Sequence, residues 1–370
     1  MKVPFVSIRK EYSFLKRKIN AVIPHVINNE SLLFGRSVGE FEKKFAKYIG
    51  SRYCLTLNSG TDALILGLRA LQLSPGDEVL LPTHTFFATA LAAVENGLKP
   101  VLVDTDINDF GMDLTDLKSK ITNRTKAIII VHLYGQAEKM EEIQQIISKD
   151  GRKIHLIEDA CQAHGALYKG KRAGSFGTFS AFSFYPTKNL GGYGDGGAVT
   201  TSNTALAKRL GFLRQYGQIK KYYHSYVGIN SRMDTIQAAI LNIKLAYLNE
   251  WNHKRQQLAK EYNRILSPLT PDIKIPVIFP ERRSVYHLYV VRALKQQKLI
   301  SYLTSHGVTT LIHYPKPIHL QKALHFLGYK RGMLPNSEKL SKEIISLPLH
   351  HFITLHQIRY VARSIQKFYQ

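Results

Sequence analysis

A chain of 370 residues is long enough for one large domain and a smaller one. Hydrophobic residues make up 44% and charged residues 21%, as in globular proteins, and no run of about 18 apolar residues marks a membrane span. The formal charge is +24, but the basic residues form no dense tract, so we expect an anionic small-molecule substrate and no nucleic acid.

The cysteines and histidines exclude two further classes of protein. The only cysteines, Cys54 and Cys161, exclude a disulfide framework and a paired-cysteine metal site. The 15 histidines show no metal-ligand spacing, so we expect no metal. The N-terminal segment MKVPFVSIRKEYSF lacks the apolar stretch of a signal peptide, and we expect a cytoplasmic protein.

The first two thirds of the chain alternate between strand and helix patterns. We expect strands at 53–57, 77–82, 99–106, 126–135 and 154–160, with helices at 61–73, 86–97 and 140–151. Apolar strands joined by helices predict an α/β fold with a parallel, doubly wound sheet. Such sheets bind ligands beyond the carboxyl ends of their strands, where Ser59, Asp159 and the loop near Lys188 should meet.

The pattern changes near residue 245. We expect one long helix at 241–266, a strand at 284–294 and a helix at 338–348. These elements predict a large domain over residues 20–245 and a smaller α/β domain over residues 246–370, with residues 1–19 packing nearby.

Three short segments carry residues suited to chemistry. In LNSGTDALILGL (57–68), Thr61 is a candidate N-cap, and the helix start could hold a phosphate or could simply be a capped helix. In IEDACQAHGA (157–166), Asp159 follows an apolar strand, where a carboxylate needs a cationic partner such as a protonated pyridine nitrogen, although it could also be an ordinary strand-end aspartate. Gln162 and His164 could hydrogen-bond a ligand.

The third segment is FSFYPTKNLGGYGDGGAV (182–199), in which Lys188 lies between aromatic residues and five glycines. Burial lowers the pKa of a lysine and favours its reaction with a carbonyl group. Ser183 could contact a phosphate. The glycines let the backbone turn tightly and approach a bulky ligand. A surface lysine in a mobile glycine loop is the alternative interpretation.

A phosphate cup, an acid for a pyridine nitrogen and a reactive lysine together are typical of pyridoxal phosphate enzymes. The chain resembles the DegT/StrS nucleotide-sugar aminotransferases, which have the type I fold of aspartate aminotransferase, over nearly its whole length. The segments that carry the resemblance are FEKKFAKYIG (41–50), SGTDAL (59–64), GDEVLLPTHTFFATALA (76–92), VHLYGQ (131–136), EDACQAHGA (158–166), FSFYPTKNLGGYGDGGAV (182–199), GINSRMDTIQAAIL (228–241) and SLPLH (346–350). The resemblance implies a large domain with a mostly parallel seven-stranded sheet between helices and a smaller α/β domain.

The resemblance also implies a role for each matching residue. Lys188 would hold pyridoxal 5'-phosphate covalently and shuttle a proton, and Asp159 would pair with the pyridine nitrogen. Further cofactor contacts would come from Gly60, Thr61 and Ser183 at the phosphate, Gln162 at the ring hydroxyl, Phe86 stacked on the ring, and Asn230 at the phosphate of a neighbouring subunit's cofactor. The sugar side would include His164, Tyr314 and His319. A homodimer with shared active sites follows from the role of Asn230.

The implied reaction is amino transfer from L-glutamate to a nucleotide-linked keto-deoxysugar. The segment QAHGA (162–166) resembles members that aminate carbon 3 of a dTDP-3-keto-6-deoxyhexose, with a 4-keto sugar as the alternative. Leu32 stands where many relatives carry an aromatic residue on the substrate side. His351 replaces a common proline, and we expect it to affect only a turn.

Three other classes fit the sequence less well. Sugar 3-dehydratases of this fold replace the reactive lysine with histidine, whereas Lys188 is present. A nicotinamide-dependent oxidoreductase would need a G-x-G-x-x-G after the first strand, which is absent. A cofactor-binding regulator without catalysis remains the distant alternative, although no helix-turn-helix lies outside the enzyme-like body.

Overall fold

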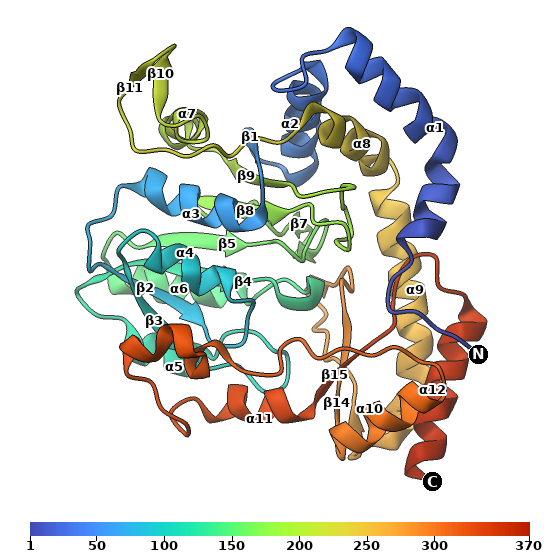
Figure 1. Ribbon diagram of the computed structural model, residues 1–370. Coiled ribbons are helices and arrows are strands. Elements are labelled where there is room, and N and C mark those ends of the chain that lie inside the picture. Colours follow the sequence, from blue (N-terminus) through green and yellow to red (C-terminus); the bar gives the residue numbers. More distant parts are fainter.

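The computed structural model describes residues 1–370 and is built on a seven-stranded sheet in the order β1-β9-β8-β5-β4-β2-β3 (Figure 1). The strands of this sheet are β1 (Tyr53–Leu57), β2 (Glu78–Pro82), β3 (Lys99–Val103), β4 (Thr125–Val131), β5 (His155–Asp159), β8 (Phe179–Ser183) and β9 (Gly197–Thr201). The four pairings from β3 to β8 are parallel, whereas β9 runs antiparallel to both β8 and β1. The predicted α/β fold with a mostly parallel seven-stranded sheet is confirmed, and β9 is the one strand that runs opposite to the other six.

Three smaller sheets complete the strands. They are β10 (Gln218–Lys220) with β11 (Tyr223–His224); β12 (Ile273–Lys274), β14 (Tyr289–Ala293) and β15 (Ile344–Leu347); and β13 (Arg282–Arg283), β6 (Leu167–Tyr168) and β7 (Lys171–Arg172). The helices are α1 (Ile8–Asn29), α2 (Arg36–Ile49), α3 (Gly60–Leu71), α4 (Ala88–Val94), α5 (Leu114–Lys120), α6 (Met140–Asp150), α7 (Thr204–Leu213), α8 (Thr235–Leu245), α9 (Leu248–Leu266), α10 (Gln296–Ser305), α11 (Pro335–Glu343) and α12 (Leu355–Tyr369). None of these helices combines the length and apolar character needed to cross a bilayer.

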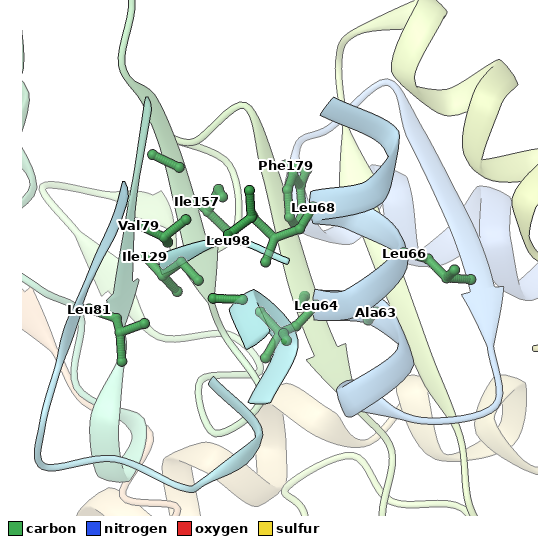
Figure 2. Close-up of a cluster of buried hydrophobic side chains, with 14 of the residues drawn as sticks. Ala63, Leu64, Leu66, Leu68, Val79, Leu81, Leu98, Ile129, Ile157 and Phe179 are labelled. Carbon is green, nitrogen blue, oxygen red and sulfur yellow. The ribbon is translucent and has the colours of Figure 1, made fainter. Parts of the chain in front are cut away.

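Helices cover both faces of the central sheet because successive strand residues point to opposite sides. In β4, Ile129 packs in the cluster formed with α3, α4 and α7, whereas Ile128 and Ile130 pack with α5 and α6. Figure 2 shows Leu64 and Leu68 of α3 lying against the side chains of the sheet. The sheet is therefore buried on both faces, which explains its nearly continuous apolar strands.

The C-terminal part of the chain has a core of its own. Side chains of β14 and β15 pack there against α9, α10 and α12, and Val3 from the N-terminal segment joins the same cluster. Figure 1 shows the long helix α9 running beside α12 at one edge of the molecule. The N-terminal segment thus contacts the C-terminal core through Val3.

Two predicted helices differ from the observed elements. The expected helix at 241–266 is two helices, α8 and α9, because α8 ends at Leu245 and α9 begins at Leu248. The expected helix at 338–348 ends at Glu343, and residues 344–347 form the buried strand β15. Pairing of β15 with β14 supplies backbone hydrogen bonds that local helix propensity cannot match.

A buried ion pair fixes α1 to the body of the protein. The Lys244 ammonium lies 2.5 Å from a carboxylate oxygen of Glu11 and donates a hydrogen bond of 2.7 Å to the carbonyl of Gly191. It also lies 3.8 Å from the centre of the Tyr193 ring. Because Gly191 follows Lys188 by three residues, this ammonium joins α1, α8 and the glycine loop.

His351 takes part in the same cluster, so the expectation that it affects only a turn is wrong. Its Nε2 lies 3.4 Å from Glu11, and its ring stacks 4.3 Å from that of Trp251. Burial alone would raise the pKa of Glu11, but hydrogen bonding to His351 and the charge of Lys244 lower it overall. Glu11 is therefore a buried anion that depends on its two partners.

We predict that Lys244→Met lowers the free energy of unfolding by about 3 kcal/mol, because it leaves the Glu11 carboxylate buried without its cation. The double variant Glu11→Met/Lys244→Met removes both charges and should be more stable than Lys244→Met alone. Urea unfolding of both variants and the wild type measures the difference. A single variant as stable as the wild type would show that this pair does not hold α1.

Candidate active site

A cavity of about 490 Å³ opens at the carboxyl edge of the central sheet. Val131, Asp159 and Ser183, the last residues of β4, β5 and β8, all line it. The start of α3, the loop after β2 and the loop between β8 and β9 form its other walls. The prediction that Ser59, Asp159 and the Lys188 loop meet at this edge is confirmed.

Lys188 lies in the loop between β8 and β9 and lines this cavity, to which it is partly exposed. The surrounding protein lowers the pKa of its amine by desolvation, and the nearby Cys161 and Asp159 oppose that shift. A lowered pKa increases the fraction of neutral, nucleophilic amine at neutral pH. The arrangement can therefore support attack of the Lys188 nitrogen on a carbonyl carbon.

The carboxylate of Asp159 is oriented from two sides. The hydroxyl of Thr89 donates to one oxygen at 2.9 Å, and the backbone N–H of Cys161 donates to the other at 3.2 Å. The Thr85 hydroxyl lies 3.1 Å from the Thr89 hydroxyl, so the two threonines form a hydrogen-bonded chain that ends at Asp159. These bonds fix the plane of a carboxylate that faces the cavity and can still accept a bond from a cationic ligand.

The start of α3 forms a candidate phosphate cup. Ser59 is the N-cap, since its hydroxyl accepts a hydrogen bond from the backbone N–H of Asp62 at 3.1 Å, so the prediction of Thr61 as the N-cap is wrong. Gly60 and Thr61 lie in the first turn and line the cavity. A side chain at Gly60 would meet Ser183 at 2.7 Å, so only glycine lets this turn approach β8.

Gln162 also lines the cavity and is held by two hydrogen bonds. Its side-chain oxygen accepts from the backbone N–H of Tyr134 at 2.8 Å, and its amide nitrogen donates to the hydroxyl of Tyr314 at 3.1 Å. Phe86 lines the mouth, is 55% exposed and lies 5.9 Å from the Tyr314 ring. An aromatic face open to the cavity is suited to stacking on a planar ligand.

These residues fit pyridoxal phosphate by the chemistry of their side chains. Helix-start amides at Gly60 and Thr61 suit a phosphate, the fixed carboxylate of Asp159 suits a protonated ring nitrogen, and Lys188 suits an aldehyde. All of them line one cavity, although they come from three separate segments of the chain.

The structure places His164 outside this cavity, contrary to the expected position beside the sugar. Its ring is fully buried among Phe45, Phe182 and Phe184, with ring centres 5.5–6.4 Å apart. Neither ring nitrogen has a hydrogen-bond partner. Burial, followed by the charge of Lys188, lowers the pKa of His164 to about 3. The ring is thus neutral and packs behind the Lys188 loop.

His319 is also outside the cavity. Its Nδ1 lies 2.9 Å from the Thr83 hydroxyl and its Nε2 lies 3.2 Å from Glu338, so it joins the end of β2 to α11. The motif HYPKPIHL contains both Tyr314 and His319, but it does not show that the His319 ring points away from the cavity, toward Thr83 and Glu338.

Asn230 does not line this chain's cavity. It is exposed and forms an isolated backbone bridge with Gln215. The resemblance assigns Asn230 to the cofactor of a neighbouring subunit, and its exposed side chain is accessible to such a partner.

Several residues at the site escaped the sequence interpretation. Thr89 lies inside α4, where it reaches the cavity only through its bond to Asp159, and a threonine in a helix gives no catalytic signal. His287 and His313 line the cavity, and burial lowers the pKa of His313 to about 4. In the sequence, the only indication for His313 is that it directly precedes Tyr314 in HYPKPIHL (313–320).

The chain is similar to known proteins over nearly its whole length. Residues 14–366 match the DegT/DnrJ/EryC1/StrS aminotransferase family. The chain is 42% identical to a dTDP-3-amino-3,6-dideoxy-alpha-D-galactopyranose transaminase of Aneurinibacillus thermoaerophilus, covering 99% of both chains. It is 39% identical to a UDP-2-acetamido-2-deoxy-3-oxo-D-glucuronate aminotransferase of Pseudomonas aeruginosa, covering 98% of this chain and 99% of the relative.

A crystal structure of Streptomyces venezuelae DesV in complex with a ketimine intermediate superposes with a TM-score of 0.96 at 40% identity, covering 100% of this chain and 99% of that one. The family match spans nearly the whole chain, and the superposition includes the sheet, the C-terminal core and the segments that line the cavity. The chain therefore belongs to the DegT/DnrJ/EryC1/StrS aminotransferase family.

Proposed function

We propose that the protein uses pyridoxal 5'-phosphate to transfer the amino group of L-glutamate to a nucleotide-linked keto sugar. The substrate we propose is a dTDP-3-keto-6-deoxyhexose, and the product is a dTDP-3-amino-3,6-dideoxyhexose. The observation that carries the proposal is the cavity in which Lys188, with its lowered pKa, lies with the oriented carboxylate of Asp159 and the start of α3.

Each of these residues has a separate task. Bound pyridoxal phosphate supplies an aldehyde and an electron-accepting ring. Lys188 would hold the cofactor through its amine nitrogen, and the same amine would serve as the base that moves a proton during amino transfer. Asp159 would hold a proton on the ring nitrogen, and the hydroxyl of Thr89 keeps that carboxylate aligned.

The substrate assignment is supported by chemistry at the mouth of the cavity and by the relatives. Phe86, Tyr185 and Tyr314 present aromatic surface there, which suits the planar base or the apolar face of a deoxysugar. The +24 charge favours the approach of a diphosphate. The two relatives described above are a 3-amino sugar transaminase and a 3-oxo sugar aminotransferase by name, which supports carbon 3 over carbon 4.

The proposed enzyme is a homodimer with shared active sites. Asn230 is exposed and lies away from its own cavity, as a residue that reaches a partner's cofactor must be. Two apolar side chains near the hairpin of β10 and β11 are also exposed. Tyr222, between the two strands, is 79% exposed, and Val227, which follows β11, is 84% exposed. Exposed apolar side chains of this kind are typical of interfaces between copies of a chain.

We predict that Lys188→Ala keeps noncovalent affinity for pyridoxal phosphate but loses turnover by roughly 10³-fold or more, because the base and the covalent attachment are lost together. Borohydride reduction followed by mass spectrometry should detect a lysine-linked cofactor in the wild type and none in this variant. Lys208→Ala, at an exposed position on α7, is the matched control and should behave as the wild type. Substantial turnover by Lys188→Ala would contradict the proposal. A wild type that binds DNA and turns over no sugar would favour the regulator instead.

The sugar and the nucleotide can be tested together. We expect amination at carbon 3 when protein, cofactor and glutamate are incubated with dTDP-3-keto-6-deoxyhexose, detected by mass spectrometry and NMR of the product. Parallel incubations would contain the dTDP-4-keto sugar and a UDP-linked 3-keto sugar. Product only from the 4-keto sugar would keep the enzyme class and overturn the carbon assignment. A preference for the UDP sugar would overturn the nucleotide.

We propose a packing role for His164, and its buried neutral ring yields a pH prediction. The unfolded chain protonates this histidine near pH 6.5, whereas the folded pKa of about 3 keeps it neutral, so stability falls as the pH drops from about 6.5 toward 3. Between pH 8 and pH 5 this side chain alone should cost the wild type about 2 kcal/mol of unfolding free energy.

His164→Phe removes that titration while filling the aromatic pocket, so we predict a shallower loss of stability in urea unfolding at the two pH values. Turnover should be largely retained. A turnover loss of roughly 10²-fold or more with unchanged pH dependence of stability would restore the catalytic role implied by the resemblance.

A further inference from the structure

A second cavity, of about 290 Å³, lies between α9 and the small sheet β13-β6-β7. It is lined by Gly165, Leu167, Arg172, Asn249, Asn252, His253, Gln256, Arg283 and Val285. None of these residues lines the candidate active site, and none is acidic. In Figure 1, β7 lies on the side of the central sheet that faces α9.

The sheet register brings two arginines to this cavity. Leu167 in the middle strand β6 is directly opposite Arg172 of β7 on one side and Arg283 of β13 on the other. Directly opposed residues of antiparallel strands point to the same face of a sheet, and neighbouring strands are about 4.8 Å apart. The two guanidinium side chains therefore start about 10 Å apart on the same face and border one space.

Neither guanidinium is neutralised by a carboxylate. Arg172 stacks on Tyr48, with its guanidinium carbon 4.1 Å from the ring centre. Arg283 makes only long contacts, of 3.3 and 3.4 Å, to the side-chain oxygen of Gln256. By contrast, the adjacent Arg282 forms a buried ion pair of 2.9 Å with Asp109. The acidic side chains of this region thus leave the two cavity arginines unpaired.

The facing wall comes from one face of α9, on which Asn249, Asn252, His253 and Gln256 follow the i, i+3, i+4, i+7 spacing. The side-chain oxygen of Asn249 accepts a hydrogen bond of 2.8 Å from Tyr48, which leaves its amide N–H groups free to donate. Gln256 and Asn252 are already hydrogen-bonded within the protein, so the free donors of this wall come from Asn249.

Asn252 makes the floor of the cavity rigid. It is buried, donates to the carbonyl of His164 at 2.7 Å, and accepts from the amide of Asn189 at 2.8 Å. Asn189 directly follows Lys188 and lies 3.2 Å from Nδ1 of His287, which lines the active-site cavity. One hydrogen-bonded layer of side chains thus separates the second cavity from the Lys188 loop.

We propose that this second cavity is a binding site for the phosphate groups of a small phosphorylated metabolite. Planar guanidinium groups donate paired hydrogen bonds to phosphate oxygens, and Arg172 and Arg283 supply two such groups without competing carboxylates. Asn249 and His253 add side-chain N–H donors from α9. The volume of about 290 Å³ exceeds that of one phosphate and suits a diphosphate or a phosphorylated sugar.

The site is tested on the cofactor-loaded protein by calorimetric titration with inorganic diphosphate at about 0.15 M salt, where weak surface attraction is screened. The proposal expects saturable binding to the wild type and at least about tenfold weaker binding to Arg172→Gln/Arg283→Gln, which keeps polar side chains but removes both charges. Lys254→Gln is the matched control, because Lys254 is exposed on α9 and lies outside the cavity. It should bind as the wild type does.

Three results would overturn the proposal: no saturable binding to the wild type, equal binding by the double variant, or an equal loss in Lys254→Gln. Equal binding by the double variant would place the diphosphate in the active-site cavity instead. Thermal unfolding of each variant checks its fold. If loss of the stacking on Tyr48 destabilises the double variant, Arg283→Gln alone decides, because its contacts are long and weak. The test measures binding without turnover, so its outcome is independent of the proposed reaction.

Discussion

Two consecutive carboxylates at the end of β5 are the constraint on which the site depends. Glu158 and Asp159 are both buried, and their side chains point to opposite faces of the strand. Burying an anion is unfavourable unless hydrogen bonds and cations compensate. Each carboxylate therefore gathers its own set of donors, and these two sets organise the segments on either side of the sheet.

Glu158 shapes the loop that leads into β8. Its two oxygens accept hydrogen bonds of 2.6–2.7 Å from the backbone N–H groups of Gly174, Phe176 and Gly177. His132 lies 2.8 Å from the same carboxylate and connects it to the end of β4. Since β8 ends at Ser183 and leads to Lys188, this buried anion helps to set where the reactive loop begins. Asp159, on the other face, collects Thr89 and the Cys161 amide and points into the cavity.

The Lys188 loop is held from behind by residues far away in the chain. Lys244 holds Gly191 while paired with Glu11, and Asn252 holds Asn189. These contacts fix a glycine-rich segment and offset the large conformational entropy that its backbone loses on folding. The same Asn252 forms the floor of the second cavity, so α9 contacts both the reactive loop and the proposed phosphate site. The excess of basic over acidic residues is visible locally at Arg172 and Arg283, which have no carboxylate partner.

The fold class and the meeting of three cavity segments could be predicted from local sequence patterns, whereas the roles of the other cavity residues came from the family resemblance. Continuous apolar strands joined by helices define a parallel sheet, and strand ends of a parallel sheet meet at one edge, which brought Ser59, Asp159 and Lys188 together. Tertiary contacts decided the rest. Pairing with β14 made residues 344–347 a strand, and packing among phenylalanines turned the His164 ring away from the cavity. The position of a side chain that lies between distant elements depends on long-range packing, which no local window of sequence contains.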